Sequence, residues 1–233
     1  MQAIVDPSHR LPLAARDALA GLLLADLAAE RRSSDGVPAA LAVVLRAAGG
    51  GVDGTRLDAA VCAALVEAGV LAREGGPARD GAATLVRVAA PWTAAVRHKL
   101  ESYARVLVCV PRGADLPARL TQARALLEHG LFFEVHEVLE PAWRSAVGEA
   151  RETLHGLIQA AVAWHHWQGG NAAAASRLAG SARARLAGTP GVWEGFPAGE
   201  LRRCIAAWEE WLRSARSEEP PPLPFRAARG PRS

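Results

Sequence analysis

Apolar residues recur along most of the chain at the three- and four-residue spacing of an α-helix, in which each residue turns the backbone by about 100°. In the N-terminal half this pattern predicts helices over residues 12–32, about 38–48 and about 55–68. In the C-terminal half it predicts a helix from Asp115 to Gly130, two between residues 131 and 168, one from Asn171 to Leu186, and a last one over about 198–215. The sequence therefore predicts a mainly α protein that ends in a bundle of about five helices.

Two short apolar runs, residues 70–72 and 85–88, flank a loop that is rich in glycine, proline and charge. They predict a β-hairpin after the third helix, and this helix with its hairpin resembles a winged-helix unit. One interpretation is DNA binding through the third helix, and the other is a small α/β interaction domain. We favour the interaction domain, because Arg56 is accompanied by Asp58 and Glu67 and no basic cluster is available for phosphates.

The run from Arg112 to Ala114 is the expected domain junction. Before it, Pro91 opens a segment with helical spacing, but its end, residues 106–110, is β-branched enough to form a strand instead. After the bundle, the last residues are rich in proline and arginine, a composition typical of disorder. We expect an N-terminal helical, winged-helix-like domain over 1–111, a helical bundle over 112–216 and a disordered tail over 217–233.

The composition excludes several classes of protein. A net charge of +3 over 233 residues, with Lys99 as the only lysine, does not by itself indicate a nucleic-acid binder. No run of eighteen apolar residues occurs, so no membrane span is expected. Cys62, Cys109 and Cys204 are far apart and odd in number, which favours buried free thiols and a cytoplasmic location.

The most informative stretch is HEVLEPAW, residues 136–143. On a helix, Phe133, His136, Glu140 and Trp143 form one stripe beside an apolar stripe, whereas Glu134 and Arg144 can reach water. The polar pair is therefore expected at the edge of a buried face.

The following helix carries a second polar row. His155, Gln159, Val162 and His166 return to nearly the same angle around the helix axis. A short link at 145–149 predicts that the two helices are antiparallel neighbours whose polar rows meet.

One hypothesis for this cluster is a divalent metal ion held by His136, Glu140 and His166, with Gln159 or a water completing the coordination. Histidine and carboxylate four residues apart can bind one ion, as in HExxH zinc enzymes, and Glu137 stands where those enzymes have their general base. The mixed nitrogen and oxygen ligands suit zinc, manganese or iron.

The other hypothesis is a buried polar cluster without a ligand. An unpaired buried polar atom costs about 1–3 kcal/mol, so polar groups inside a bundle must satisfy one another. His136 then bonds Glu140 or Gln159, and Arg151 neutralises the carboxylate. Trp143 and the tryptophans of the next helix pack the core or line a small-ligand pocket, and we favour packing.

The motifs of this region together resemble the bacterial and archaeal domain of unknown function 309. The resemblance covers roughly residues 117–187 and consists of a His-x-x-x-Glu-x-x-Trp helix, an Arg, a Gly-Leu-Ile-Gln run and a His before Gly-Asn. It implies an all-helical fold and metal binding through the His and Glu, and no reaction. The residues that carry it are His136, Glu140, Trp143, Arg151, Gly156, Leu157, Ile158, Gln159, His166, Gly170 and Asn171.

Two functions follow from the sequence. The favoured one is a non-catalytic binding or regulatory module, whose partner is a small ligand or a protein. The alternative is a metal-dependent hydrolase-like enzyme using His136, Glu140 and His166. Whether the chain is an enzyme is left open at this point.

Overall fold

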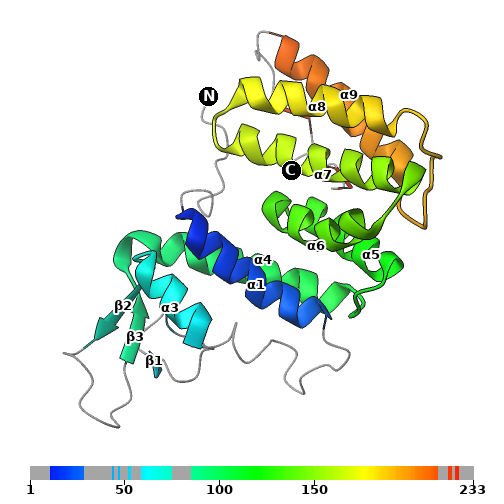
Figure 1. Ribbon diagram of the computed structural model, residues 1–233. Coiled ribbons are helices and arrows are strands. Elements are labelled where there is room, and N and C mark those ends of the chain that lie inside the picture. The colour runs from blue at the N-terminus through cyan, green and yellow to red at the C-terminus, as the bar shows by residue number, and fades with distance from the viewer. Residues whose placement is uncertain are drawn as a thin grey trace, which may run out of the picture. The chain divides into compact units, whose positions relative to one another are not determined.

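The computed structural model describes residues 11–28, 44, 47, 52–53, 59–74, 85–214, 220–221 and 224–225 (Figure 1). The chain forms two compact units, residues 1–112 and 113–233. The domain limits expected from the sequence, 1–111 and 112–216, remain a prediction.

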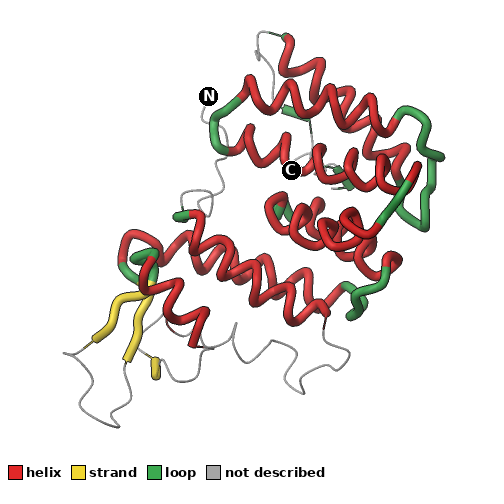
Figure 2. Tube along the Cα trace, in the orientation of Figure 1, coloured by secondary structure: helices red, strands yellow, loops and turns green. Residues whose placement is uncertain are grey.

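The first unit combines helices with a small sheet. Its described helices are α1 (Leu13–Ala28), α3 (Ala59–Glu67) and α4 (Thr93–Cys109), the last preceded by a 3-10 turn, η3 (Ala90–Trp92). Its strands are β1 (Val52–Asp53), β2 (Leu71–Glu74) and β3 (Leu85–Val88). The sheet is antiparallel with the order β1-β3-β2, shown in yellow in Figure 2.

The predicted hairpin is present as β2 and β3, with Leu71 opposite Val88. Along β3, Val86 and Val88 are buried and Arg87 between them is exposed, which is the alternation of a strand with one covered face. The sequence did not predict β1. Of the helix expected over 38–48, only Val44 and Ala47 are described, and both are helical and buried.

Residues 106–109 end α4 as a helix and do not form a strand. Val106 and Leu107 are buried on the same face as Leu100 and Tyr103, so tertiary packing overrides the β-propensity of the valines. The cysteines are free, as expected, but none is fully buried: Cys109 is exposed, and Cys62 and Cys204 are half-buried.

The second unit is helical in its described part. Its helices are α5 (Leu116–Glu128), α6 (Phe132–Ser145), α7 (Gly148–Gln168), α8 (Ala172–Leu186) and α9 (Ala198–Arg213). Helices that follow one another in the chain pack side by side, most extensively α7 against α8 (Figure 1). The expected mainly α fold is confirmed.

The helix ends match the predicted capping residues. The Asp115 carboxylate accepts a hydrogen bond from the Ala118 N–H at 2.8 Å, and Asn171 Oδ1 accepts one from the Ala174 N–H at 3.0 Å. Gly170 has a φ of 78°, the left-handed conformation that ends α7 without steric cost. These short connections make α6, α7 and α8 successive neighbours.

Aromatic side chains join α7 to α9. The rings of Trp164 and Trp208 are 5.4 Å apart, Trp167 is 5.9 Å from Trp208, and Trp211 is 5.8 Å from Trp167. We call these four residues the tryptophan ladder. The core-packing interpretation applies to Trp164 and Trp208, which are both 2% exposed.

Part of the expected tail lies against the bundle. Pro224 is buried, and the Phe225 ring lies 5.6 Å from Phe196 and under the Arg124 guanidinium. Pro220 and Pro221 are half-buried, and the other residues of the expected tail lie outside the described ones. Within the part of the chain that the structure describes, every helix is too short or too polar to cross a bilayer.

Candidate metal centre

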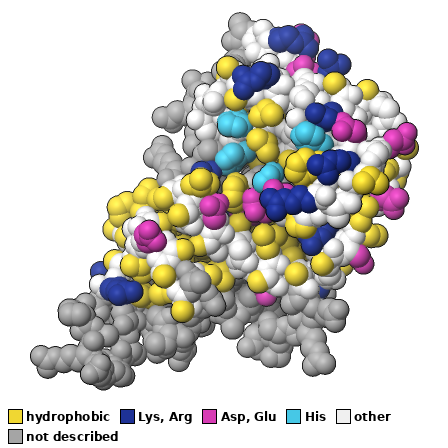
Figure 3. Space-filling model, in the orientation of Figure 1, with side chains coloured by type: hydrophobic (Ala, Val, Ile, Leu, Met, Phe, Trp, Pro, Cys, Tyr) yellow, Lys and Arg dark blue, Asp and Glu magenta, His cyan; other side chains and the backbone are white. Residues whose placement is uncertain are grey.

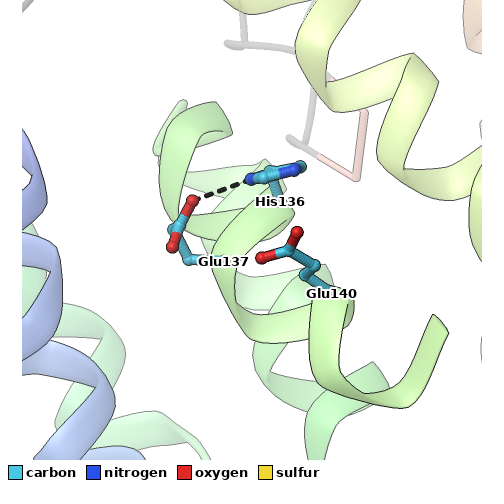
Figure 4. Close-up of side chains that lie close together, drawn as sticks. All are labelled: His136, Glu137 and Glu140. Carbon is cyan, nitrogen blue, oxygen red and sulfur yellow. Dashed lines mark hydrogen bonds and ion pairs between the residues drawn. The ribbon is translucent and has the colours of Figure 1, made fainter. Parts of the chain in front are cut away.

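One turn of α6 gathers the side chains that can bind a cation. His136, Glu137 and Glu140 each offer a ligand atom, and these atoms lie within 4.8 Å of one another (Figure 4). All three residues are half-buried. Among the described residues this is the group of His, Cys, Asp or Glu side chains that has the spacing of a metal site.

His136 is oriented by its sequence neighbour. Its Nδ1 lies 2.8 Å from Oε1 of Glu137, and the two side chains are 33% and 29% exposed. A carboxylate only accepts hydrogen bonds, so the neutral imidazole donates from Nδ1 and keeps the lone pair of Nε2 for another partner. Metal-bound histidines usually have such a second hydrogen bond, which fixes the tautomer.

The same carboxylate changes the acidity of the imidazole. The hydrogen bond to Glu137 raises the pKa of His136 above its ordinary value of 6.5. Burial opposes this effect, and the negative charges of Glu137 and Glu140 add to it. The site therefore attracts positive charge, whether a proton or a metal ion.

Glu140 has an exposed partner. Arg144 Nη2 donates to Oε1 of Glu140 at 2.8 Å, and the arginine side chain is 71% exposed. An exposed ion pair of this kind contributes only about 0–1 kcal/mol. A cation at the carboxylate can displace the arginine at little cost.

The donor set fits a divalent metal ion. Two ligand atoms that each lie about 2.1 Å from one ion are at most about 4.2 Å apart. The ligand atoms of His136, Glu137 and Glu140 lie within 4.8 Å of one another, so the widest pair would have to close by at most about 0.6 Å. One imidazole with carboxylates suits zinc, manganese or iron.

The residues of α7 that were expected to face this cluster contact other side chains. Gln159 Oε1 accepts a hydrogen bond from Arg185 Nε of α8 at 3.1 Å. His166 is not a member of the cluster, and its ring lies 6.3 Å from that of His165. Instead, His165 lies 5.9 Å from Phe133, one turn before His136. The rows of α6 and α7 therefore meet at Trp143 and His155, whose rings lie 5.3 Å apart, whereas Gln159 pairs with α8.

Arg151 was expected to neutralise Glu140, but Arg144 pairs with that carboxylate. The Nη1 group of Arg151 donates to the Trp143 carbonyl at 3.0 Å and lies 3.4 Å from the carbonyls of Arg144 and Ala146. Its guanidinium also lies 4.7 Å from the centre of the Trp143 ring. Arg151 therefore satisfies the carbonyl groups at the C-terminus of α6, where the helix dipole favours a cation.

The interpretation of Glu134 as a solvent-exposed residue was wrong. It was expected to reach water, yet its exposed fraction is 0%. It lies in the first turn of α6, where a negative charge is favourable. The spacing of four residues to the buried Val138 was a signal of its burial.

Comparisons with known proteins agree with the motifs. Residues 120–178 match the model of a family described as "Domain of unknown function (DUF309)". An uncharacterized protein of Aquifex aeolicus (strain VF5) is 30% identical over 125 residues, which make up 53% of this chain and 36% of that protein. The chain thus spans about a third of the length of the curated relative that it matches.

No solved structure matches the chain. The family match spans most of α5, all of α6 and α7, and the first part of α8. The resemblance inferred from the motifs is therefore confirmed over residues 120–178, where the chain matches this family model.

Proposed function

We propose that the C-terminal unit is a binding module whose ligand is a divalent metal ion at His136 and Glu140, and that the protein works in the cytoplasm. The observation that carries the proposal is the set of ligand atoms within 4.8 Å of one another on one turn of α6. Half-burial supports it further, because a partly shielded site strengthens the attraction between carboxylate and cation.

The side chains have different roles in this proposal. Nε2 of His136 and a carboxylate oxygen of Glu140 bind the ion, while Glu137 orients the imidazole through Nδ1. Water completes the coordination, and His166 as a further ligand stays a prediction. A bound metal ion would supply Lewis acidity and a water of lowered pKa.

Metal analysis of the purified chain tests the proposal. We expect about one equivalent of zinc or manganese by calorimetric titration, and a loss of about tenfold or more in affinity for His136→Ala and for Glu140→Gln. Glu149→Gln is the matched control, because Glu149 is an exposed carboxylate of α7 outside the cluster. A wild-type chain that binds neither metal, and whose melting temperature is the same with and without a chelator, would refute the proposal.

A metal-dependent hydrolase is the alternative function. In HExxH enzymes the glutamate after the first histidine acts as general base on the metal-bound water. Here the corresponding Glu137 is hydrogen-bonded to His136, an arrangement that supports an orienting role. We therefore favour binding over hydrolysis. Ester or phosphoester turnover that needs metal and is abolished by Glu137→Gln would reverse this preference.

For the first unit we propose a protein-interaction domain in preference to a winged-helix DNA reader. The described helix α3 carries one charged residue, Glu67, and no lysine or arginine that could contact phosphate. Arg56 lies outside the described residues. Duplex binding that weakens steeply with salt, and weakens again in Arg56→Gln, would favour the DNA-binding alternative.

A further inference from the structure

We propose that Arg185, His155 and Arg151 form a recognition subsite for an oxyanion, the carboxylate or phosphate group of a small molecule. The subsite lies beside the candidate metal centre and defines the class of molecule that the centre binds. The claim that this subsite selects the molecule bound at the metal rests on the proposed function. The claim that the subsite binds an anion rests on the contacts of its own residues.

A glycine allows the subsite to form. A Cβ at Gly156 of α7 would lie 2.7 Å from Cγ of Leu186 and 3.3 Å from Cβ of Arg185. Any larger residue would therefore push α8 away from α7. The missing side chain lets the Leu186 side chain and Cβ of Arg185 approach α7 closely.

Arg185 extends across this surface. Its Nε donates to Gln159 Oε1 at 3.1 Å, and its Nη1 donates to the Glu152 carboxylate. Glu152 and Gln159 are seven residues apart, so they lie on one face of α7 with His155 between them. The two partners of Arg185 thus flank His155 along α7, and the charge of Arg185 is close enough to lower the pKa of the imidazole.

His155 contributes a neutral donor. Burial lowers the pKa of His155 below its ordinary value of 6.5, and the charges of Arg185 and Arg151 act in the same direction, partly opposed by Glu152. The ring is therefore uncharged at neutral pH and can donate one N–H. It lies 5.3 Å from the Trp143 ring, which holds it against α6.

Arg151 supplies the second guanidinium. It lies against Trp143 and uses Nη1 for the carbonyl groups of α6. No described residue accepts a hydrogen bond from Nη2 of Arg151 or from Nη2 of Arg185. An oxyanion accepts hydrogen bonds from guanidinium groups strongly, and these N–H groups are available for it.

The subsite and the candidate metal centre are neighbours along α6. Trp143 follows Glu140 by three residues, a rise of about 4.5 Å. Figure 3 shows histidine side chains gathered on one face over α6 and α7, with arginine and acidic side chains beside them. A molecule of a few ångströms can thus bind with its anionic group on the arginines and another polar group at the metal.

Titration of the full chain without metal tests the anion site by itself. Inorganic phosphate, and acetate in a second series, are added at constant ionic strength while the imidazole resonance of His155 is followed by NMR, assigned with His155→Gln. We expect saturable shifts with at least one of the two anions. Arg185→Gln should weaken that binding by about tenfold or more, since it removes a charged donor.

The matched control is Arg183→Gln. Arg183 lies on the same helix but pairs with Glu209 of α9 at 2.8 Å, so binding should be unchanged. Arg185→Lys keeps the charge but loses the two-pronged geometry, and intermediate affinity is expected if Arg185→Gln fails to fold. The proposal is overturned if neither anion gives a saturable shift, or if Arg183→Gln weakens binding as much as the Arg185 variants.

A second titration with zinc separates this proposal from the metal site. Arg185→Gln should keep wild-type zinc affinity, and bound zinc should tighten phosphate or acetate binding in the wild type. Anion binding by a chain that binds neither zinc nor manganese would overturn the proposed function and leave the anion site standing. Zinc binding without anion binding would overturn the subsite alone.

Discussion

His136 and His155 are half-buried imidazoles on adjacent helices, yet their environments act in opposite directions. The carboxylate of Glu137 raises the pKa of His136, whereas burial and two arginines lower the pKa of His155. At neutral pH the first is poised to exchange a proton for a metal ion, and the second remains uncharged. Neither effect could be read from the residue types alone, because each depends on which neighbour the side chain reaches.

The first prediction concerns Glu137→Gln. Removing the charge should lower the pKa of His136 towards 6.5, measured by NMR titration. The folded-state pKa of the wild type is raised, so this interaction stabilises the fold fully below the unfolded-state pKa and is lost as the pH rises through the folded-state value. The variant should therefore lose up to about 1 kcal/mol of stability near pH 6 and nothing well above the folded-state pKa.

The pH dependence of metal binding tests the acidity of His136 in a second way. Because a proton and a metal ion compete for His136, wild-type zinc affinity should fall as the pH drops below the raised pKa. An unchanged pKa for His136 in Glu137→Gln would show that the hydrogen bond does not control the imidazole.

At the scale of helices, the sequence was a good guide to the elements and a poor guide to their partners. Apolar spacing predicted α5 to α9 because a buried helical face repeats locally, and Asp115 and Asn171 predicted their own caps. Gln159 of α7 was expected to face the polar cluster of α6, but its side chain accepts a hydrogen bond from Arg185 of α8. That choice depends on how closely α8 approaches Gly156, a tertiary contact with no local pattern.

The second prediction tests this close approach. Gly156→Ala should gain about 1 kcal/mol of helix propensity but lose about 1–3 kcal/mol through overpacking against Leu186. We expect a net loss of stability in chemical denaturation. Combining it with Leu186→Ala should cost less than the sum of the two single changes, because the smaller side chain makes room. Strict additivity would mean that the two residues do not press on each other.

The third prediction concerns the end of α6. Arg151→Met keeps much of the side-chain length but removes the donors to the α6 carbonyl groups and the cation over Trp143. We expect a loss of about 1–2 kcal/mol in thermal or chemical unfolding. Arg144→Met, which removes only an exposed ion pair, should change stability by less than about 1 kcal/mol. Equal losses in the two variants would contradict the capping role.

At the scale of the whole molecule, the chain divides into two compact units, and the division lies between Arg112 and Gly113 in the sequence. The domain junction that the sequence predicts at 112–114, where hairpin patterning gives way to bundle patterning, stays a prediction. Strand β1 was not visible in the sequence, because a strand of two residues has no periodicity to detect. The chemistry of the second unit was recognised through motif spacing, which conveys residue types but not their register across helices.

The fourth prediction is that the units unfold separately. Leu139 is fully buried in α6, so Leu139→Ala should destabilise the second unit by about 2–5 kcal/mol. Hydrogen exchange should then speed up in α6 and α7 and stay unchanged in α1 and α4. Faster exchange throughout α1 and α4 would show instead that the chain unfolds as a single cooperative structure.

The tryptophan ladder has an optical consequence. Indoles whose centres lie 5.4 to 5.9 Å apart couple their electronic transitions, so α7 and α9 together form one chromophore. The ellipticity of that coupled system vanishes as soon as the two helices separate, even while each stays coiled. Circular dichroism of the tryptophans can therefore follow the separation of α7 from α9 without any added dye.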